Sequence, residues 1–101
     1  MKVTRVQYTV RAEFVEENKR NIAAVMRQLR ELGGHDVKYA VYLQQDGRTF
    51  IHVVHQNTAE AEQFPTSLEG FKTFQTQLKP NLEGPPKVEA LALVESSAPI
   101  F

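Results

Sequence analysis

The sequence predicts an α+β domain in which strands and helices follow the order β-α-β-β-α-β. Three observations lead to this prediction. A tight turn at Gln45–Arg48 separates two strand-like segments, Val37–Leu43 and Phe50–His55. Helical periodicity precedes and follows this hairpin, and an alternating segment stands near each end of the chain. In 101 residues, this order is typical of the ferredoxin-like fold with a four-stranded antiparallel sheet.

Length and composition indicate one small globular domain, residues 1–101. The 12 basic and 12 acidic residues cancel, which argues against nucleic-acid binding because phosphate recognition needs a basic surface. The absence of cysteine excludes disulfides and thiolate chemistry. No apolar run approaches the roughly 20 residues that span a bilayer, and Met1–Arg5 leads directly into a strand without a signal peptide. We therefore expect a soluble cytoplasmic protein that binds neither nucleic acid nor membranes.

The first strand, Val3–Arg11, alternates between a mainly apolar face and a polar face. Two helices cover only one face of such a sheet, and an exposed apolar face marks an interaction site. We therefore expect the apolar face to pack against the sheet of a second copy, in a homodimer, and the polar face to point toward the helices. The apolar face carries Thr4, Val6, Tyr8 and Val10, and the polar face carries Arg5, Gln7 and Thr9.

The first helix is predicted over Phe14–Leu32, where apolar residues recur at helical spacing. Gly33-Gly34 ends this helix, because glycine adopts the left-handed conformation without steric cost. His35 is expected to be solvated in the turn that follows. The apolar positions of the helix are Val15, Ile22, Val25, Met26, Leu29 and Leu32.

The hairpin and the second helix carry recognisable local signals. Asp46-Gly47 supplies the positive φ that a tight hairpin turn requires. The helical segment after the hairpin, Ala59–Leu78, is interrupted at Pro65. Each half begins with a capping signature, which is a polar capping residue followed three positions later by a glutamate. The two signatures are Asn57–Glu60 and Thr66–Glu69.

The last strand is predicted over Val88–Val94, after Gly84-Pro85-Pro86 has ended the helical region. Apolar residues on both of its faces predict a strand that is covered on both sides. A single sheet with two helices leaves one face uncovered, so this strand also indicates a second copy of the chain.

These features resemble the dimeric α+β barrel superfamily, and most closely its small antibiotic-biosynthesis-monooxygenase-like proteins. The resemblance covers nearly the whole chain and is carried by Val6–Val10, Thr49–Glu62 and Leu68–Phe74. It implies that two sheets form a barrel with the helices outside. It also implies a small-molecule cleft between sheet and helices in each subunit.

The same resemblance implies two kinds of enzyme, cofactor-independent oxygenases of polycyclic aromatics and haem-degrading monooxygenases. The asparagine, tryptophan and histidine of the haem enzymes align with or near Gln7, Phe64 and Gln75. Because all three positions differ and glutamine is not a useful iron ligand, the resemblance implies the cleft without the haem. We therefore expect no cofactor.

His52 and His55 are the candidate catalytic residues. Residues three apart on a strand point to opposite faces, so the two cannot chelate one ion, and no ligand-spaced Asp, Glu or Cys accompanies them. We therefore expect no metal site. Either histidine can act as a general acid or base near neutral pH. Either can equally be a buried core histidine with one hydrogen bond.

Ligand-binding candidates come from the first strand and the second helical region. The polar face of the first strand would orient a ligand in the cleft, or its ends would reach solvent through the twist of the sheet. Aromatic residues at helical spacing would line the outer wall of the cleft, or simply fill the core. These candidates are Arg5, Gln7 and Thr9 from the strand, and Phe64, Phe71 and Phe74 from the helical region.

Three functional hypotheses follow. The first is binding of a small apolar or aromatic compound and its cofactor-independent monooxygenation, since a deprotonated substrate can react with oxygen directly. The second is a non-catalytic, stress-related or ligand-sensing dimer. The third is an RNA-recognition module, because Gly47–Val53 faintly resembles the third-strand motif of such modules and Tyr8 and Phe50 would then stack on bases. Poor motif spacing and the neutral charge disfavour this third hypothesis.

Overall fold

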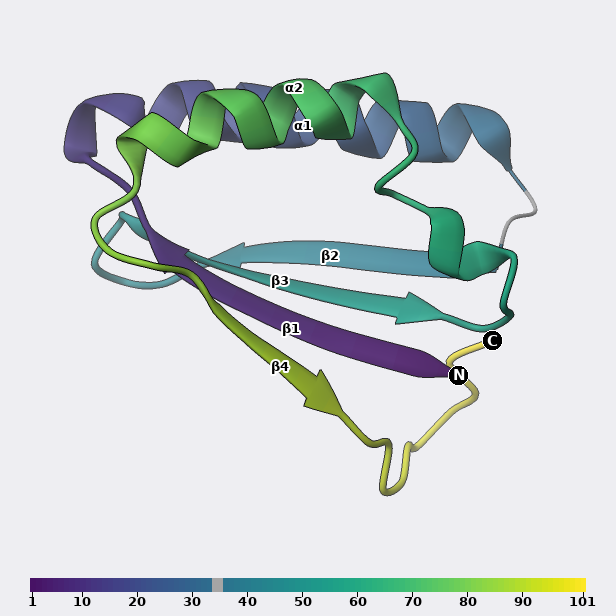
Figure 1. Ribbon diagram of the computed structural model, residues 1–101. Coiled ribbons are helices and arrows are strands. Elements are labelled where there is room, and N and C mark those ends of the chain that lie inside the picture. The colour runs from purple at the N-terminus through teal and green to yellow at the C-terminus, as the bar shows by residue number, and fades with distance from the viewer. Residues whose placement is uncertain (34–35) are drawn as a thin grey trace.

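The computed structural model describes residues 1–33 and 36–101 and confirms the predicted fold. Its four strands form one antiparallel sheet in the order β2-β3-β1-β4. Both helices lie on the same face of this sheet and leave the other face open (Figure 1). The elements are β1 (Lys2–Thr9), α1 (Val15–Leu32), β2 (Val37–Leu43), β3 (Thr49–Gln56), α2 (Glu69–Leu78) and β4 (Lys87–Leu91), with 3₁₀ turns at Ala12–Phe14, Ala61–Gln63 and Lys79–Asn81.

The hydrophobic core fills the space between the helices and the sheet. Tyr8 and Val10 are buried in it and Val6 packs against it. The prediction for the two faces of β1 was therefore wrong, because the apolar face of this strand meets the helices. Burial of these side chains between the two layers is what stabilises the contact between helices and sheet.

The polar residues of β1 lie on the open face, where neighbouring strands supply their partners. Arg5 donates from Nη1 to Glu89 Oε1 at 3.0 Å and from Nη2 to Gln7 Oε1 at 2.7 Å. The hydroxyls of Thr9 and Thr49 lie 2.8 Å apart. These contacts pair polar side chains at the sheet surface.

Helix α1 buries the predicted face with one exception at its end. Val15, Val25 and Leu29 are buried, whereas Leu32 is 50% exposed. Gly33 follows the helix with a φ of 61°, and its N–H bonds to the carbonyl of Leu29. Gly34 and His35 lie outside the described residues, so the expectations for these two positions are not tested.

The second helix is shorter than predicted. Regular helix spans only Glu69–Leu78, and a single 3₁₀ turn at Ala61–Gln63 replaces the predicted first half. Thr58 Oγ1 accepts a hydrogen bond from the N–H of Ala61 at 3.1 Å, which caps this turn. Pro65 cannot donate a backbone hydrogen bond and keeps the preceding residue out of the helical region, which explains the break. The second predicted capping signature was wrong, because Leu68 stands at the cap position and no side chain caps α2.

The hairpin between β2 and β3 is confirmed. Gly47 has a φ of 74°. Asp46 Oδ1 accepts hydrogen bonds from the N–H groups of Arg48 and Thr49, both at 2.9 Å, and Oδ2 accepts one from the Thr49 hydroxyl at 2.6 Å. These bonds lower the pKa of the Asp46 carboxyl, because they stabilise its charged form.

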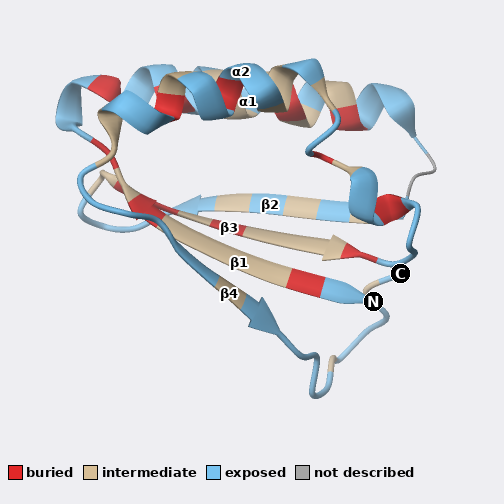
Figure 2. Ribbon diagram, in the orientation of Figure 1, coloured by how far each residue is buried: buried red, intermediate tan, exposed pale blue. Residues whose placement is uncertain are grey.

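Strand β4 is an edge strand that is exposed in the single chain, so the prediction that both of its faces are covered rests on a second copy and stays a prediction. Figure 2 shows β4 exposed along most of its length and the buried residues gathered on the other strands and on the helices. Val88 is 65% exposed and Val94 is 95% exposed. The strand lies at the sheet edge and slants away from the helix layer, so no helix covers it (Figure 1).

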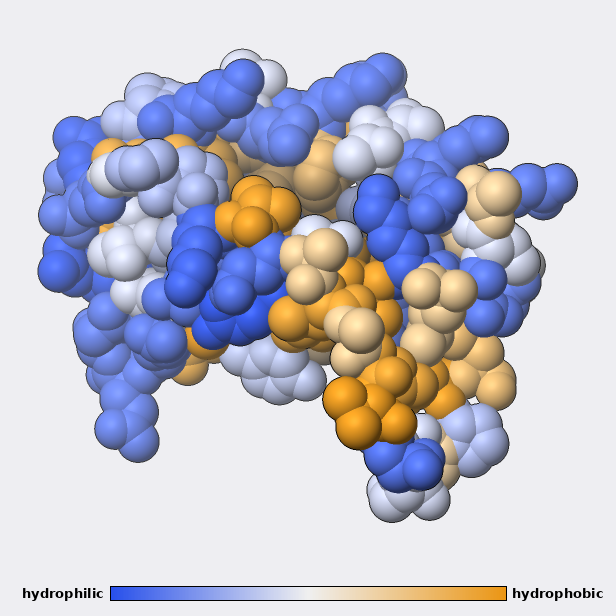
Figure 3. Space-filling view, turned by 60° about the horizontal axis from the view of Figure 1, so that its bottom comes forward, coloured by the Kyte–Doolittle hydropathy of each residue, from blue (hydrophilic) through white to orange (hydrophobic). Residues whose placement is uncertain are grey.

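The open side of the molecule gathers apolar side chains near the end of β4 and the tail that follows it. Figure 3 shows this patch toward the lower right, the side on which both chain termini lie in Figure 1. Its exposed members include Leu91, Leu93 and Val94. Within the described part of the chain, neither helix combines the length and the apolar character needed to cross a membrane.

Leu29 and Leu32 provide a matched test of the core, since both are leucines of α1 and only the first is buried. Replacing Leu29 by Ala leaves a cavity and is expected to lower the free energy of unfolding by about 2–5 kcal/mol. Leu32→Ala is expected to change it by no more than about 0.5 kcal/mol. Urea denaturation at pH 7 measures both, and equal losses would contradict this orientation of the helix.

Candidate functional site

Four polar side chains form a hydrogen-bonded chain through the core. Tyr39 Oη lies 2.6 Å from His52 Nδ1, and His52 Nε2 lies 2.7 Å from Tyr8 Oη. Asn18 Nδ2 donates to Tyr8 Oη at 3.0 Å. The members come from β2, β3, β1 and α1, so the chain joins three adjacent strands to the first helix. We call these four residues the Tyr–His–Tyr–Asn chain.

Strand register brings the three aromatic members together. His52 lies opposite Val6 of β1 and Val41 of β2. Tyr8 and Tyr39 each stand two residues from those positions, on the same face and therefore diagonal to His52. Diagonal neighbours across strands lie within reach of aromatic side chains. The imidazole is thus held from both sides.

The inner part of the chain is sealed from solvent. His52 and Tyr8 are each 4% exposed and Asn18 has no exposed surface. The ring of Phe74 lies 5.6 Å from the His52 ring and 6.5 Å from the Tyr8 ring, and Phe50 stacks on Tyr8 at 5.7 Å. Tyr39, at the β2 end, is only half-buried.

Burial keeps all three titratable members neutral at pH 7. It lowers the pKa of His52 from 6.5 to about 4, because an imidazolium loses its hydration in the core. It raises the pKa of Tyr8, against a smaller opposing effect of the Asn18 hydrogen bond. It also raises the pKa of Tyr39, with a further contribution from charge on Tyr8. The chain therefore contains one imidazole proton and one proton on each phenol.

Tyr39 also borders the space between α1 and β2. A hollow of about 300 Å³ is lined there by Met26, Leu29, Arg30, Val37, Lys38 and Tyr39. A second hollow of about 230 Å³ is lined by Lys19, Ile22, Val41, Tyr42, Leu43 and Phe50. We call the first of these hollows the α1–β2 groove, because Tyr39 lines it and does not line the second. It places a mostly apolar, solvent-open site next to the outer end of the Tyr–His–Tyr–Asn chain.

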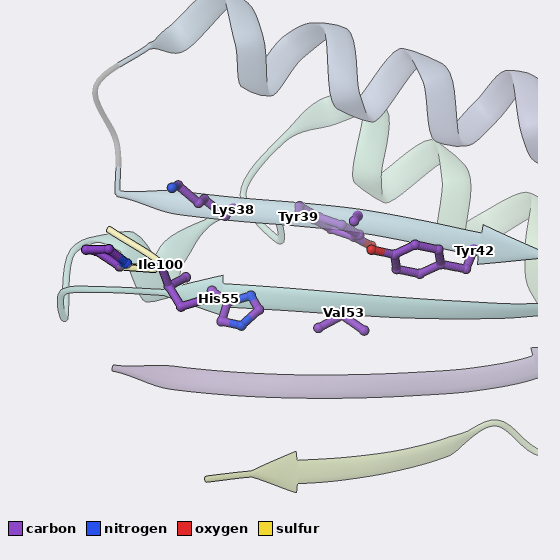
Figure 4. A pocket seen from close by; sticks show the side chains of 8 residues that line it. Lys38, Tyr39, Tyr42, Val53, His55 and Ile100 are labelled. Carbon is purple, nitrogen blue, oxygen red and sulfur yellow. The ribbon is translucent and has the colours of Figure 1, made fainter. Parts of the chain in front are cut away.

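His55 belongs to a different surface. It lines a hollow of about 360 Å³ on the open face together with Val53, Tyr42 and residues of the C-terminal tail such as Ile100 (Figure 4). The ammonium of Lys38 lies 5.3 Å from the ring centroid of Phe101 at the same place. His52 and His55 thus occupy opposite faces of β3, as predicted.

The structure divides the predicted site residues between the two faces of the sheet. His52 and Phe74 lie together between sheet and helices, Phe71 packs against Phe74 at 5.7 Å, and Phe64 packs against the same core. The open face carries the other four, Arg5, Gln7, Thr9 and His55. The expectation that the polar face of β1 lines a sheet–helix cleft was therefore wrong.

The sequence interpretation missed the polar partners of His52. Tyr8 was predicted to face a second copy of the chain, and neither Tyr39 nor Asn18, which donates to Tyr8, was among the candidate site residues. The signal for Asn18 was nevertheless present, because position 18 lies four residues after Phe14 and four before Ile22, on the apolar face of the helix. A buried asparagine on such a face requires a polar partner.

The RNA-recognition hypothesis is not compatible with this packing. Tyr8 and Phe50 are 4% and 2% exposed beneath the helices, so neither can stack on a base at the sheet surface. Among residues 1–33 and 36–101, no three His, Asp or Glu side chains are close enough to hold a metal ion.

Comparison with known proteins supports the fold. No protein-family model matches the sequence, and no curated protein shows significant sequence similarity. Solved structures match over nearly the whole chain. An antibiotic biosynthesis monooxygenase is 12% identical with a TM-score of 0.77, covering 94% of this chain and all of its own.

Two further structures agree. Rv0793 of Mycobacterium tuberculosis is 15% identical with a TM-score of 0.76, covering 96% of this chain and 98% of its own. SnoaB, a cofactor-independent oxygenase of Streptomyces nogalater, is 14% identical with a TM-score of 0.70, covering 95% of this chain and 96% of its own. The chain thus has the ferredoxin-like fold of antibiotic-biosynthesis-monooxygenase-like proteins, which confirms the resemblance at the level of the fold.

The buried imidazole makes the fold sensitive to acid. The unfolded chain protonates His52 near its ordinary pKa of 6.5, whereas the folded chain does so only near 4. This contribution to stability is therefore fully present above about pH 6.5 and is lost as the pH falls toward 4, with a loss of about 2–3 kcal/mol at about pH 4.5. Urea denaturation at about pH 6.5 and about pH 4.5 should show a smaller loss of unfolding free energy at the lower pH in His52→Gln than in the parent protein. His55→Gln is the control and should keep the full effect, while equal acid sensitivity of all three proteins would contradict the burial of a neutral His52.

Proposed function

We propose that the protein binds a small apolar or aromatic molecule in the α1–β2 groove and oxidises it without a cofactor. The carrying observation is the position of Tyr39, which borders the groove and is hydrogen-bonded to the buried His52. Ligand sites are typically apolar hollows with a few placed polar groups, and this groove fits that description. The structural likeness to a protein named as an antibiotic biosynthesis monooxygenase and to one named as a cofactor-independent oxygenase also supports the proposal.

The proposed reaction needs only stabilisation of a substrate anion. A substrate that loses a proton next to a carbonyl or phenol spreads the negative charge onto its oxygen, where a phenolic O–H can stabilise it. The carbanion form then reacts with dioxygen. One oxygen atom remains as a new carbonyl and the other leaves as water, so a methylene becomes a ketone without an external reductant.

One observation favours a second function, non-catalytic ligand sensing. The pKa of His52 near 4 makes this imidazole a weak base at pH 7. Proton removal would then depend on the acidity of the substrate itself. In the sensing alternative, the groove and Tyr39 bind the same class of molecule, and no oxygen is consumed.

Groove occupancy can be tested with a filling substitution. Val37 lines the larger hollow, so Val37→Trp is expected to abolish thermal stabilisation by two- and three-ring ketones and phenols that stabilise the parent protein. Leu32→Trp, at an exposed position on α1, should leave it unchanged. An oxygen electrode then separates the two functions, since consumption with a bound compound supports oxidation and binding alone supports sensing. Equal stabilisation of Val37→Trp and the parent protein would place binding outside the groove.

We also infer that a second copy of the chain covers the open sheet face. Tyr42 is 60% exposed there, the apolar patch around Leu91 extends this surface, and the pairing of Arg5 with Glu89 neutralises its charges. Such a surface favours association with another apolar surface.

Light scattering at low micromolar concentration tests the dimer. The expected mass is near twice 11.5 kDa. Tyr42→Glu should shift the protein toward monomer, because it places an unpaired charge in the proposed interface. Leu32→Glu adds the same charge on the helix layer and should leave the dimer intact. A monomeric parent protein would contradict the inference.

A further inference from the structure

The protons in the Tyr–His–Tyr–Asn chain can be counted. Each tyrosine has one O–H, the neutral imidazole has one N–H, and the amide of Asn18 donates only through Nδ2. In the described part of the chain, Tyr8 Oη has hydrogen-bond partners only in His52 Nε2 and Asn18 Nδ2. Among residues 1–33 and 36–101, the buried Asn18 Oδ1 has no hydrogen-bond partner. These constraints limit the ways in which the protons can be arranged.

The amide of Asn18 has one favourable orientation. With Nδ2 toward Tyr8, one of its two N–H groups is paired, and Oδ1 is the amide atom left without a partner among the described residues. The turned amide would instead leave an NH₂ group with two donors unpaired in a site without solvent access. Unpaired buried donors are rarer in proteins than under-satisfied acceptors. The donating orientation of Asn18 is therefore preferred.

Because Asn18 donates to Tyr8, the positions of the protons on Tyr8, His52 and Tyr39 follow. Its N–H occupies the lone pair of the Tyr8 oxygen on that side, so the O–H of Tyr8 must point to His52 Nε2. The imidazole proton then lies on Nδ1 and is donated to Tyr39 Oη. The O–H of Tyr39 is consequently not used within the chain. In the reverse arrangement, Tyr8 Oη would accept from both His52 Nε2 and Asn18 Nδ2, and its own buried O–H would have no acceptor among the described residues.

We propose that Asn18 is a positioning residue that fixes this direction, so that Tyr39 presents its O–H to an acceptor oxygen of the molecule in the α1–β2 groove. The inference rests on the proposed function, because it takes that groove as the binding site. It assigns Tyr39 as the donor to the ligand oxygen, which is the carbonyl or phenolate of the apolar ring compound proposed above. The lining of the larger hollow agrees, since its charged members are Arg30 and Lys38, both basic.

The direction of the hydrogen bonds in the Tyr–His–Tyr–Asn chain can be read from the two ring nitrogens of His52 by ¹⁵N NMR, because protonated and unprotonated ring nitrogens resonate far apart. The parent protein is expected to show a protonated Nδ1 and an unprotonated Nε2. Asn18→Leu keeps the volume and removes the facing donor, so the population with a protonated Nε2 should rise. A protonated Nε2 in the parent protein would overturn the proposal. An unchanged tautomer in Asn18→Leu would overturn the role of Asn18.

Ligand binding tests the presented proton separately, with 1-tetralone and tetralin as probes of the same shape with and without the oxygen. The parent protein is expected to bind the ketone at least about tenfold more tightly, as one desolvated hydrogen bond allows. Tyr39→Phe should reduce the ratio of the two affinities to about one while keeping the affinity for tetralin. Circular dichroism confirms that the variant is folded, and Leu32→Ala, at an exposed position of α1 outside the groove, is the control.

The outcomes separate the two levels of the proposal. If neither probe binds the parent protein, the groove is not a site for this class of molecule and the proposed function fails with it. If both probes bind with equal affinity, the groove is a site but Tyr39 does not present a proton, and only this inference fails. A preference for the ketone that survives in Tyr39→Phe would assign the donor to another residue.

Discussion

The two hydrogen bonds to the His52 imidazole constrain the rest of the structure. A buried imidazole must have both nitrogens paired, or the fold loses about 1–3 kcal/mol for each unpaired group. The two phenols reach it only from diagonal positions on the neighbouring strands, Tyr8 on β1 and Tyr39 on β2. A register slip of one residue would move a strand's whole set of side chains to the opposite face. The same pairing that completes the sheet therefore assembles the polar chain.

The helices complete the arrangement and divide the molecule into two chemically different sides. Between the layers, Asn18 of α1 and Phe74 of α2 close off the imidazole, and only Tyr39 reaches a solvent-open groove. On the open face, Arg5 and Glu89 satisfy each other at the sheet surface. One side can thus bind a small molecule while the other is available to a second copy of the chain.

The sequence was sufficient for the fold but only partly for the site. Asp46-Gly47 and the helical periodicity of α1 are local signals, and each specified its element. Alternation along β1 separated two faces correctly, yet it does not indicate which face the helices cover, and the wrong choice placed Arg5 in a cleft. His52 was identified as a candidate by residue type. Its partners could not be predicted, because Tyr8 is 44 residues away and Tyr39 is 13 away, and only the strand register brings them together.

The central claim is that Tyr8, His52 and Tyr39 form one coupled unit, and a double-mutant cycle tests it most directly. Tyr8→Phe, Tyr39→Phe and the double variant would be compared with the parent protein by urea denaturation at pH 7. Because each hydrogen bond polarises the imidazole for the other, the double variant should lose less stability than the sum of the single losses, by about 1 kcal/mol. Losses that add within about 0.3 kcal/mol would show that the two tyrosines pack independently, and would contradict the account.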